Sequence, residues 1–401
     1  MGELADTLPV AAPEDVGMSS ARLERLSQAM QGYIDRQEMA GAATLIARRG
    51  KIVHVGSFGM ANIARAEPID PSTLYRIASM TKPITSVAVM MLFEEGRVHL
   101  NDPIENYLPE LGDVQVIARD DSPDGYHVEP ARNPVTVRHL LTHSSGYTYG
   151  DPEPLGECHR KAGIPAGFEN TDDTIGAAVK RLGAVPLLFH PGEGWAYGVS
   201  TDVLGRLVEV VSGSSLDAFF EARILAPLGM SDTHFFLPAE KVARLASVYT
   251  RRDSGALEHV ESDYPYKGPG TLFMGGAGLC STITDYARFL QMMLNGGHLG
   301  DARLLSRRTV DLVRENHVGD LHAAERPGYG FGLGFAVHAD AGRSSDILPV
   351  GSYLWGGYWH TTFWIDPVEE LIAIKMSQVF PADHLDDHQA LQPLVYGAID
   401  D

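Results

Sequence analysis

Cysteine, positive charge and long apolar runs are all scarce in this sequence of 401 residues. Cys158 and Cys280 are too few and too far apart for a disulfide framework or a cysteine-rich metal site. The 32 lysines and arginines against 52 acidic residues give a formal charge of −20, which argues against a nucleic-acid partner. No apolar run approaches the roughly 20 residues that span a bilayer, so no membrane association is expected.

The segment from Met1 to Val16 has neither the basic start nor the apolar stretch of a secretory signal. A cytoplasmic location is therefore expected. Hydrophobic residues make up 44% of the chain, which is typical of a globular protein with a sizeable core and excludes a disordered chain.

Apolar periodicity predicts a helix from Ser20 to about Arg36, a strand hairpin of residues 43–47 and 52–57, and a long helix from Met80 to Glu95 that ends at Gly96. Further helices are predicted at residues 135–142, 173–182, 202–211, 216–224, 284–294 and 389–399. Late strands are predicted at residues 331–337, 353–358, 361–365 and 371–378.

This order of elements predicts a mixed α/β fold in which one sheet takes strands from both ends of the chain. The expected α/β domain comprises residues 1–78 and 271–401, and residues 79–270 form a mainly helical domain, with the active site in the cleft between them. Segments rich in glycine and proline, Pro123 to Pro134 and Tyr264 to Gly278, are expected to be loops near the ends of the helical insert.

A Ser-x-x-Lys motif, Ser79 to Lys82, lies where a loop turns into the long helix. A spacing of three places both side chains on one helix face, within reach of each other. A serine nucleophile needs a nearby base because its hydroxyl keeps its proton at neutral pH. Lysine can be that base only if its pKa falls, and the helix start favours negative charge on the serine. The structural alternative is a serine cap followed by a solvated lysine.

Two later segments could complete a catalytic site. Tyr197 lies between a loop and a helix, where its phenol could face Ser79 and act as a base beside a cation. Gly356 and Gly357 in a late strand allow a close backbone approach, so the N–H of Tyr358 could form an oxyanion hole with that of Ser79. The structural alternatives are an aromatic anchor for the loop and a glycine bulge in the strand.

In this order, the three segments resemble the serine beta-lactamase and penicillin-binding-protein superfamily. The resemblance is stronger to the family VIII carboxylesterases, which have a class C beta-lactamase-like fold. Other segments resemble motifs of the same family and extend the likeness over nearly the whole chain: Leu140-Leu-Thr-His143-Ser-Ser-Gly146, Pro227-Leu-Gly-Met230, Gly275 to Thr282, Asp285 to Phe289, and Gly328 to Gly334. The resemblance implies a beta-lactamase/transpeptidase-like fold, with an antiparallel sheet flanked by helices and an all-helical domain.

The resemblance also implies a role for each matching residue. Ser79 is the residue that becomes acylated. Lys82 and Tyr197 share its proton and return it to the leaving alcohol, and water then releases the acyl group. The backbone N–H groups of Ser79 and Tyr358 form the oxyanion hole.

Two departures from the family pattern bear on the substrate. Penicillin-recognising members carry Tyr-x-Asn, but here the third position is Val199, which has no amide. They also carry Lys-Thr-Gly or His-Thr-Gly where this chain has Trp355-Gly356-Gly357. The cation that would pair with a lactam carboxylate is thus replaced by an apolar wall, which favours a neutral ester. The expected pocket residues are Trp355, Gly356, Gly357, Val199 and Tyr147.

Weaker signals come from histidines and aromatic residues. His143 is expected to hold its turn by a hydrogen bond, and His360 either lines the pocket mouth or points away. His384 and His388 bracket two aspartates, a pattern that suggests a metal but is expected to be a solvated surface helix. Aromatic pocket walls or core packing could come from Tyr147, Tyr149, Trp195, Tyr358 and Trp359.

The sequence therefore predicts a serine hydrolase that cleaves small-molecule carboxylic esters of short to medium acyl chain through an acyl-enzyme on Ser79. Neither a metal nor an organic cofactor is expected. Three alternatives stay open: a beta-lactamase or D-Ala-D-Ala peptidase, an acyltransferase of the same superfamily, and a catalytically silent binding protein.

Overall fold

The computed structural model of the chain describes residues 8–120, 125–165, 168 and 171–401. The helices are α2 (Ser20–Asp35), α3 (Thr81–Glu94), α4 (Val137–Leu141), α5 (Leu155–Ala162), α6 (Ile175–Leu182), α7 (Ser200–Ser212), α8 (Leu216–Phe220), α9 (Ala226–Leu228), α10 (Ile283–Leu294), α11 (Arg307–Val313) and α12 (Asp387–Tyr396). A 3-10 turn, η2 (Ala78–Met80), leads into α3, and a π-helical turn, η5 (Glu221–Leu225), follows α8.

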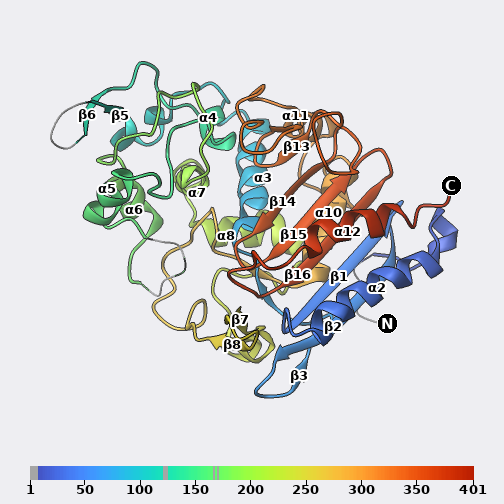
Figure 1. Cartoon of the computed structure of the whole chain (residues 1–401). Helices are drawn as coiled ribbons and strands as arrows, with labels where there is room; N and C mark the ends of the chain where they lie inside the picture. Colours follow the sequence, from blue (N-terminus) through green and yellow to red (C-terminus); the bar gives the residue numbers. More distant parts are fainter. Residues whose placement is uncertain (1–7, 121–124, 166–167, 169–170) are drawn as a thin grey trace.

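An antiparallel sheet of eight strands takes its strands from both ends of the chain (Figure 1). Its order is β12 (Tyr329–Phe331), β13 (Ala336–His338), β14 (Tyr353–Gly357), β15 (Thr361–Asp366), β16 (Leu371–Ser377), β1 (Gly41–Arg48), β2 (Lys51–Asn62) and β3 (Glu67–Pro68). The first and last parts of the chain meet where β1 pairs with β16, with Leu45 opposite Ile374. The expected sheet built from both chain ends is confirmed.

Short two-stranded ribbons accompany the sheet. They pair β4 (Tyr75–Arg76) with β9 (Cys280–Ser281), β5 (Gln115–Arg119) with β6 (Tyr126–Pro130), β7 (Val248–Arg251) with β8 (Leu257–Val260), and β10 (His298–Leu299) with β11 (Ala302–Arg303). The β4–β9 ribbon lies immediately before η2, so it fixes the chain just ahead of the Ser79 region.

Helices cover both faces of the sheet, as the alternation of side chains along its strands requires. On β1, Ala43 and Leu45 pack in the same buried cluster as residues of α10. Ala42 and Ile46 point to the other face and pack in the cluster that contains α2 and α12. Figure 1 shows α2 and α12 side by side across that face. An antiparallel sheet flanked by helices is the arrangement that the family resemblance implies.

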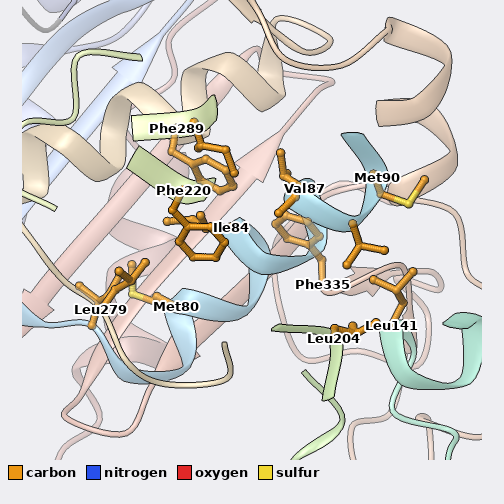
Figure 2. Close-up of a cluster of buried hydrophobic side chains, with 14 of the residues drawn as sticks. Met80, Ile84, Val87, Met90, Leu141, Leu204, Phe220, Leu279, Phe289 and Phe335 are labelled. Atoms are coloured by element: carbon orange, nitrogen blue, oxygen red, sulfur yellow. The ribbon is translucent and has the colours of Figure 1, made fainter. Parts of the chain in front are cut away.

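Helix α3 runs through the centre of the molecule and carries the Ser-x-x-Lys lysine. Every residue from Thr81 to Leu92 is buried, so the helix is enclosed on all sides rather than amphipathic. Figure 2 shows Met80, Ile84, Val87 and Met90 surrounded by side chains from other elements, among them Phe220, Phe289 and Phe335. A lysine on such a helix is therefore held away from bulk water.

Most of the expected elements are confirmed within a few residues, but the strand expected at residues 331–337 is wrong. This segment is a tight hairpin, with β12 ending at Phe331 and β13 beginning at Ala336. Gly334 has a φ of 96°, and a Cβ there would lie 2.1 Å from the Oγ of Ser86 on α3. The glycine spacing thus builds a turn that packs against α3, where alternation alone suggested one continuous strand.

The loop expected at residues 123–134 is also corrected, because Tyr126–Pro130 forms strand β6; residues 121–124 lie outside the described part of the chain. The domain boundaries expected at residues 78 and 271 stay a prediction. Within the described residues, no helix combines the length and the apolarity needed to cross a membrane.

Candidate active site

Ser79 lies in η2, at the point where the chain enters α3, and its side chain is partly exposed. The preceding residue, Ala78, has a φ of 45°, in the left-handed region that an alanine rarely adopts. Such a conformation persists only where the surrounding structure enforces it, and it is typical of functional sites. Here the backbones on either side are held, because Ile77 N–H donates to Leu279 O and Met80 N–H donates to Ile77 O, both at 3.0 Å.

The Lys82 ammonium is buried and has three hydrogen-bond acceptors. Its Nζ lies 3.2 Å from Ser79 Oγ, 2.9 Å from the Tyr149 hydroxyl and 2.7 Å from the carbonyl oxygen of Gly276. An ammonium has three N–H donors and no acceptor, so this arrangement satisfies the charged form completely. The expected contact between Ser79 and Lys82 is present.

The charge state of Lys82 differs from the one that a general base needs. Burial alone would lower the pKa of Lys82, but the phenol oxygens of Tyr149 and Tyr197 and the carboxylate of Asp202 outweigh burial and hold the pKa above its usual range. Lys82 therefore carries a proton at neutral pH in the resting protein. The neighbourhood of Ser79 contains a fixed positive charge.

The Gly276 carbonyl that accepts from Lys82 belongs to a turn held by hydrogen bonds to two helices. Asp202 Oδ1 accepts a 2.8 Å hydrogen bond from Gly276 N–H, and Thr85 Oγ1 donates at 2.6 Å to the neighbouring carbonyl of Gly275. These bonds fix the glycine turn against α3 and α7. Burial raises the pKa of Asp202 to about 6, against the opposing effect of the Lys82 charge.

Tyr197 borders Lys82 through its ring rather than through its hydroxyl. Lys82 Nζ lies 4.5 Å from the ring centroid, and the Tyr197 hydroxyl accepts a hydrogen bond of 3.3 Å from the indole Nε1–H of Trp355. The ring of His143 packs against the tyrosine with centroids 5.0 Å apart, and burial keeps the pKa of this histidine well below its usual value. Trp355 therefore supplies a polar contact as well as a wall.

Tyr149, expected only as an aromatic wall, accepts a hydrogen bond from Lys82, and no pattern in the sequence predicts this contact. Tyr147 is the residue that was expected in the pocket. Tyr147 is instead buried in the core, and its hydroxyl has no hydrogen-bond partner among the residues that the structure describes. Residues 146–150 form neither a helix nor a strand, and the glycines at both ends of this segment have positive φ values. Neither a helical nor a strand period therefore shows which of the two tyrosines faces Lys82.

The end of β14 lies directly against the backbone that carries Ser79. A Cβ at position 357 would lie 2.3 Å from the carbonyl oxygen of Ile77 and 2.3 Å from Thr361 Oγ1, so only glycine fits. The close approach puts the backbone that enters Tyr358 beside η2. This placement is what an oxyanion hole formed by the N–H groups of Ser79 and Tyr358 requires.

A cavity of about 520 Å³ contains most of the expected site. It is lined by Ser79, Tyr197, Arg326, Ser345, Asp346, Leu354, Trp355, Gly356, Gly357, Tyr358, Thr361, Thr362, Trp364, His388, Gln389 and Gln392. Arg326 and Asp346 at its polar end form an ion pair of 2.7 Å, so the arginine charge is compensated within the protein. Tyr147 and Val199 are not part of this lining; Val199 is buried at the start of α7.

His143 makes the expected hydrogen bond at its turn through its backbone: its carbonyl accepts from Ala196 N–H at 3.0 Å, whereas its Nδ1 has no partner within the described residues. The expectation of a solvated surface helix around His384 and His388 holds for His384, which is exposed, but is wrong for Asp387, which begins α12. Asp387 is fully buried and accepts a hydrogen bond of 2.7 Å from His360, so this ring points toward the start of α12.

This geometry agrees with the comparisons to known proteins. The chain matches the Beta-lactamase family over residues 26–395 and belongs to that family. Proteins named as esterases and as acyltransferases are among those similar to the chain.

The esterase EstB of Burkholderia gladioli is 31% identical to the chain over 377 residues, which cover 89% of this chain and 90% of EstB. Among solved structures, EstCE1, described as a hydrolase with promiscuous acyltransferase activity, is similar with a TM-score of 0.82 and 25% identity, over 95% of this chain and 99% of EstCE1. Simvastatin synthase (LovD) from Aspergillus terreus is similar with a TM-score of 0.81 and 25% identity, over 94% of this chain and 98% of that one.

Proposed function

We propose that this protein is a carboxylesterase that forms an acyl-enzyme on Ser79. The observation that carries the proposal is the contact of the buried Lys82 ammonium with Ser79 Oγ, because Ser79 lines a cavity together with Tyr197 and the end of β14. Nucleophile, proton acceptor and oxyanion donors then surround the place where an ester carbonyl would lie.

In this mechanism Tyr197 is the general base and Lys82 is its electrostatic partner. The Lys82 ammonium lies over the ring face of Tyr197, and the Trp355 N–H donates to its hydroxyl, so both contacts hold the phenol beside Ser79 and Lys82. The phenolate takes the proton of Ser79 as Oγ attacks the carbonyl carbon. The proton then passes to the leaving alcohol as the ester C–O bond breaks, and water reverses the sequence to release the acid.

The developing oxyanion is stabilised by the backbone N–H groups of Ser79 and Tyr358. The cavity favours a neutral ester over an anionic lactam. Its wall beside the serine is Trp355, and its arginine is already paired with Asp346. The similarity to EstB, a named esterase, supports the same substrate class.

The test compares hydrolysis of short-chain nitrophenyl esters with hydrolysis of a chromogenic cephalosporin, for the wild type and for Ser79→Ala. We expect ester turnover well above lactam turnover, and loss of both in the variant. Faster lactam turnover would favour a beta-lactamase, and unchanged ester turnover in Ser79→Ala would exclude the mechanism.

Acyl transfer is the second candidate, because EstCE1 and simvastatin synthase are both similar to the chain over nearly its whole length. An acyl-serine can react with an alcohol in place of water if the alcohol reaches the cavity. Product analysis with an added alcohol distinguishes the two activities, since transfer yields a new ester and hydrolysis yields the free acid.

A further inference from the structure

A buried polar cluster lies behind the turn that presents the Tyr358 N–H. The turn joins β14 to β15 through three residues and ends at His360, whose φ is 71°. A histidine in this left-handed conformation is strained, so contacts from outside the turn must hold it.

Two side chains of β16 hold the carbonyl of His360. Ser377 Oγ donates to this oxygen at 2.8 Å, and Lys375 Nζ donates at 3.3 Å. The imidazole is held separately, because its Nε2 lies 2.7 Å from Asp387 Oδ1 at the start of α12. The left-handed residue is thus fixed by both its backbone and its ring.

Lys375 and Asp387 also form an ion pair with each other, and both side chains are 0% exposed. A buried ion pair costs desolvation free energy and is often replaceable by apolar residues without loss of stability. Stability is therefore a poor explanation for two buried charges on adjacent elements. What the pair does achieve is to join β16, α12 and the His360 turn into one rigid unit.

A metal site is the other interpretation of this cluster. Within the described residues, the possible ligand atoms of His360, Asp387 and His388 all lie within 4.8 Å of one another. However, the Lys375 ammonium pairs with Asp387 and lies 3.5 Å from His388 Nε2. A divalent cation would have to lie beside this ammonium, so like-charge repulsion disfavours it.

We propose that Lys375, Asp387 and His360 are positioning residues for the oxyanion hole, which hold the β14–β15 turn so that the Tyr358 N–H points at the reacting carbonyl. The proposal rests on the proposed esterase function. A displacement of about 1 Å in a catalytic group can lower the rate about a hundredfold. Holding the turn in place can therefore outweigh the desolvation cost of burying the two charges.

The main test is the double variant Lys375→Met/Asp387→Leu, which replaces the ion pair by apolar side chains and should still fold. We expect kcat for a nitrophenyl ester to fall about tenfold or more, with KM within about twofold of the wild type. A trifluoromethyl ketone adds to a catalytic serine and places an oxyanion in the hole. Its inhibition constant should rise by the same factor as kcat falls.

His360→Gly is the second variant, because glycine accepts the positive φ while the contact with Asp387 is lost. It should show the same fall in kcat and the same weakening of the ketone. Arg48→Met is the matched control. It removes a buried cation that pairs with Glu369 and Asp401 at the far end of β1, and it should lower stability while leaving kcat and ketone inhibition unchanged.

Wild-type kcat and ketone inhibition in both folded test variants would overturn the proposal, as would a rise in KM alone. If the double variant does not fold, His360→Gly decides by the same criteria. Failure of the esterase mechanism itself gives a different result, because the wild type would then not be inhibited by the ketone and Ser79→Ala would keep its ester turnover. That result would overturn the positioning proposal together with the mechanism.

Discussion

The indole Nε1–H of Trp355 donates a hydrogen bond of 3.3 Å to the hydroxyl of Tyr197. This contact joins the strand that replaces the usual Lys-Thr-Gly segment to the phenol that we propose as the general base. The tryptophan therefore positions the phenol hydroxyl as well as shaping the pocket.

Trp355→Phe keeps the aromatic wall and removes the indole N–H. We expect kcat/KM for a nitrophenyl ester to fall about tenfold, the effect of one hydrogen bond to a charged group. A double-mutant cycle with Tyr197→Phe tests the connection. If Trp355 acts through Tyr197, its replacement should have little further effect once the phenol hydroxyl is gone; fully additive losses would show that it acts elsewhere.

Tyr149→Phe and Tyr197→Phe distinguish the two phenols beside Lys82. Lys82 donates a hydrogen bond to the hydroxyl of Tyr149, whereas it lies over the ring of Tyr197, whose hydroxyl accepts from Trp355. We expect Tyr197→Phe to lower kcat by about a thousandfold and Tyr149→Phe by about tenfold. The reverse order, measured under saturating ester, would assign the base to Tyr149.

Gly357→Ala should disturb the site more than Gly356→Ala. The added methyl at 357 would lie 2.3 Å from Ile77 O, which forces β14 away from the Ser79 backbone, whereas at 356 its nearest neighbour is Thr361 O at 2.9 Å. We expect about a hundredfold loss of kcat for Gly357→Ala and a smaller loss for Gly356→Ala. Equal activity of the two variants would argue against a close approach at 357.

Asp202 should make the protein less stable as pH rises. Folding raises the pKa of this carboxyl from 3.8 to about 6, so between these values the folded protein binds a proton more readily than the unfolded chain. Its contribution to the free energy of unfolding is therefore greatest below about pH 4 and is lost as pH rises through about 6.

Asp202→Asn removes this dependence. The wild type loses this contribution as pH rises from 4 to 7, but the variant does not. The difference in free energy of unfolding, variant minus wild type, should therefore increase by about 1–3 kcal/mol over this range, as measured by urea denaturation. Asp285 provides a control, because burial likewise raises its pKa to about 6 in a position away from the cavity. Asp285→Asn should show the same pH trend with unchanged turnover. A constant difference across this pH range would contradict the assignment to Asp202.

Much of the fold could be predicted because local patterns and tertiary packing agree. The α2 helix begins after its Ser19 cap as its sequence indicates, and α3 ends before Gly96, which has a φ of 70°. The prediction of a strand at residues 331–337 failed because alternation does not reveal a turn whose glycine packs against Ser86. The sequence shows its glycines and predicts the helix, but it does not show that the two are in contact.

The site was predictable where a motif has a fixed local geometry and unpredictable where distant loops meet. Ser79 and Lys82 are three residues apart, so the contact between them follows from a helical turn. The acceptors of Lys82 come from Tyr149 and Gly276, far along the chain, and the donor to Tyr197 comes from Trp355. No spacing rule connects these residues, because only the closed fold brings them together.

The most direct test of the central claim is intact-protein mass spectrometry of the enzyme quenched in acid during turnover of a nitrophenyl ester, followed by peptide mapping. The account predicts a mass increase of one acyl group, located on Ser79 and absent from Ser79→Ala, together with loss of ester turnover in that variant. An acyl group on another residue, or wild-type turnover by Ser79→Ala, would contradict it.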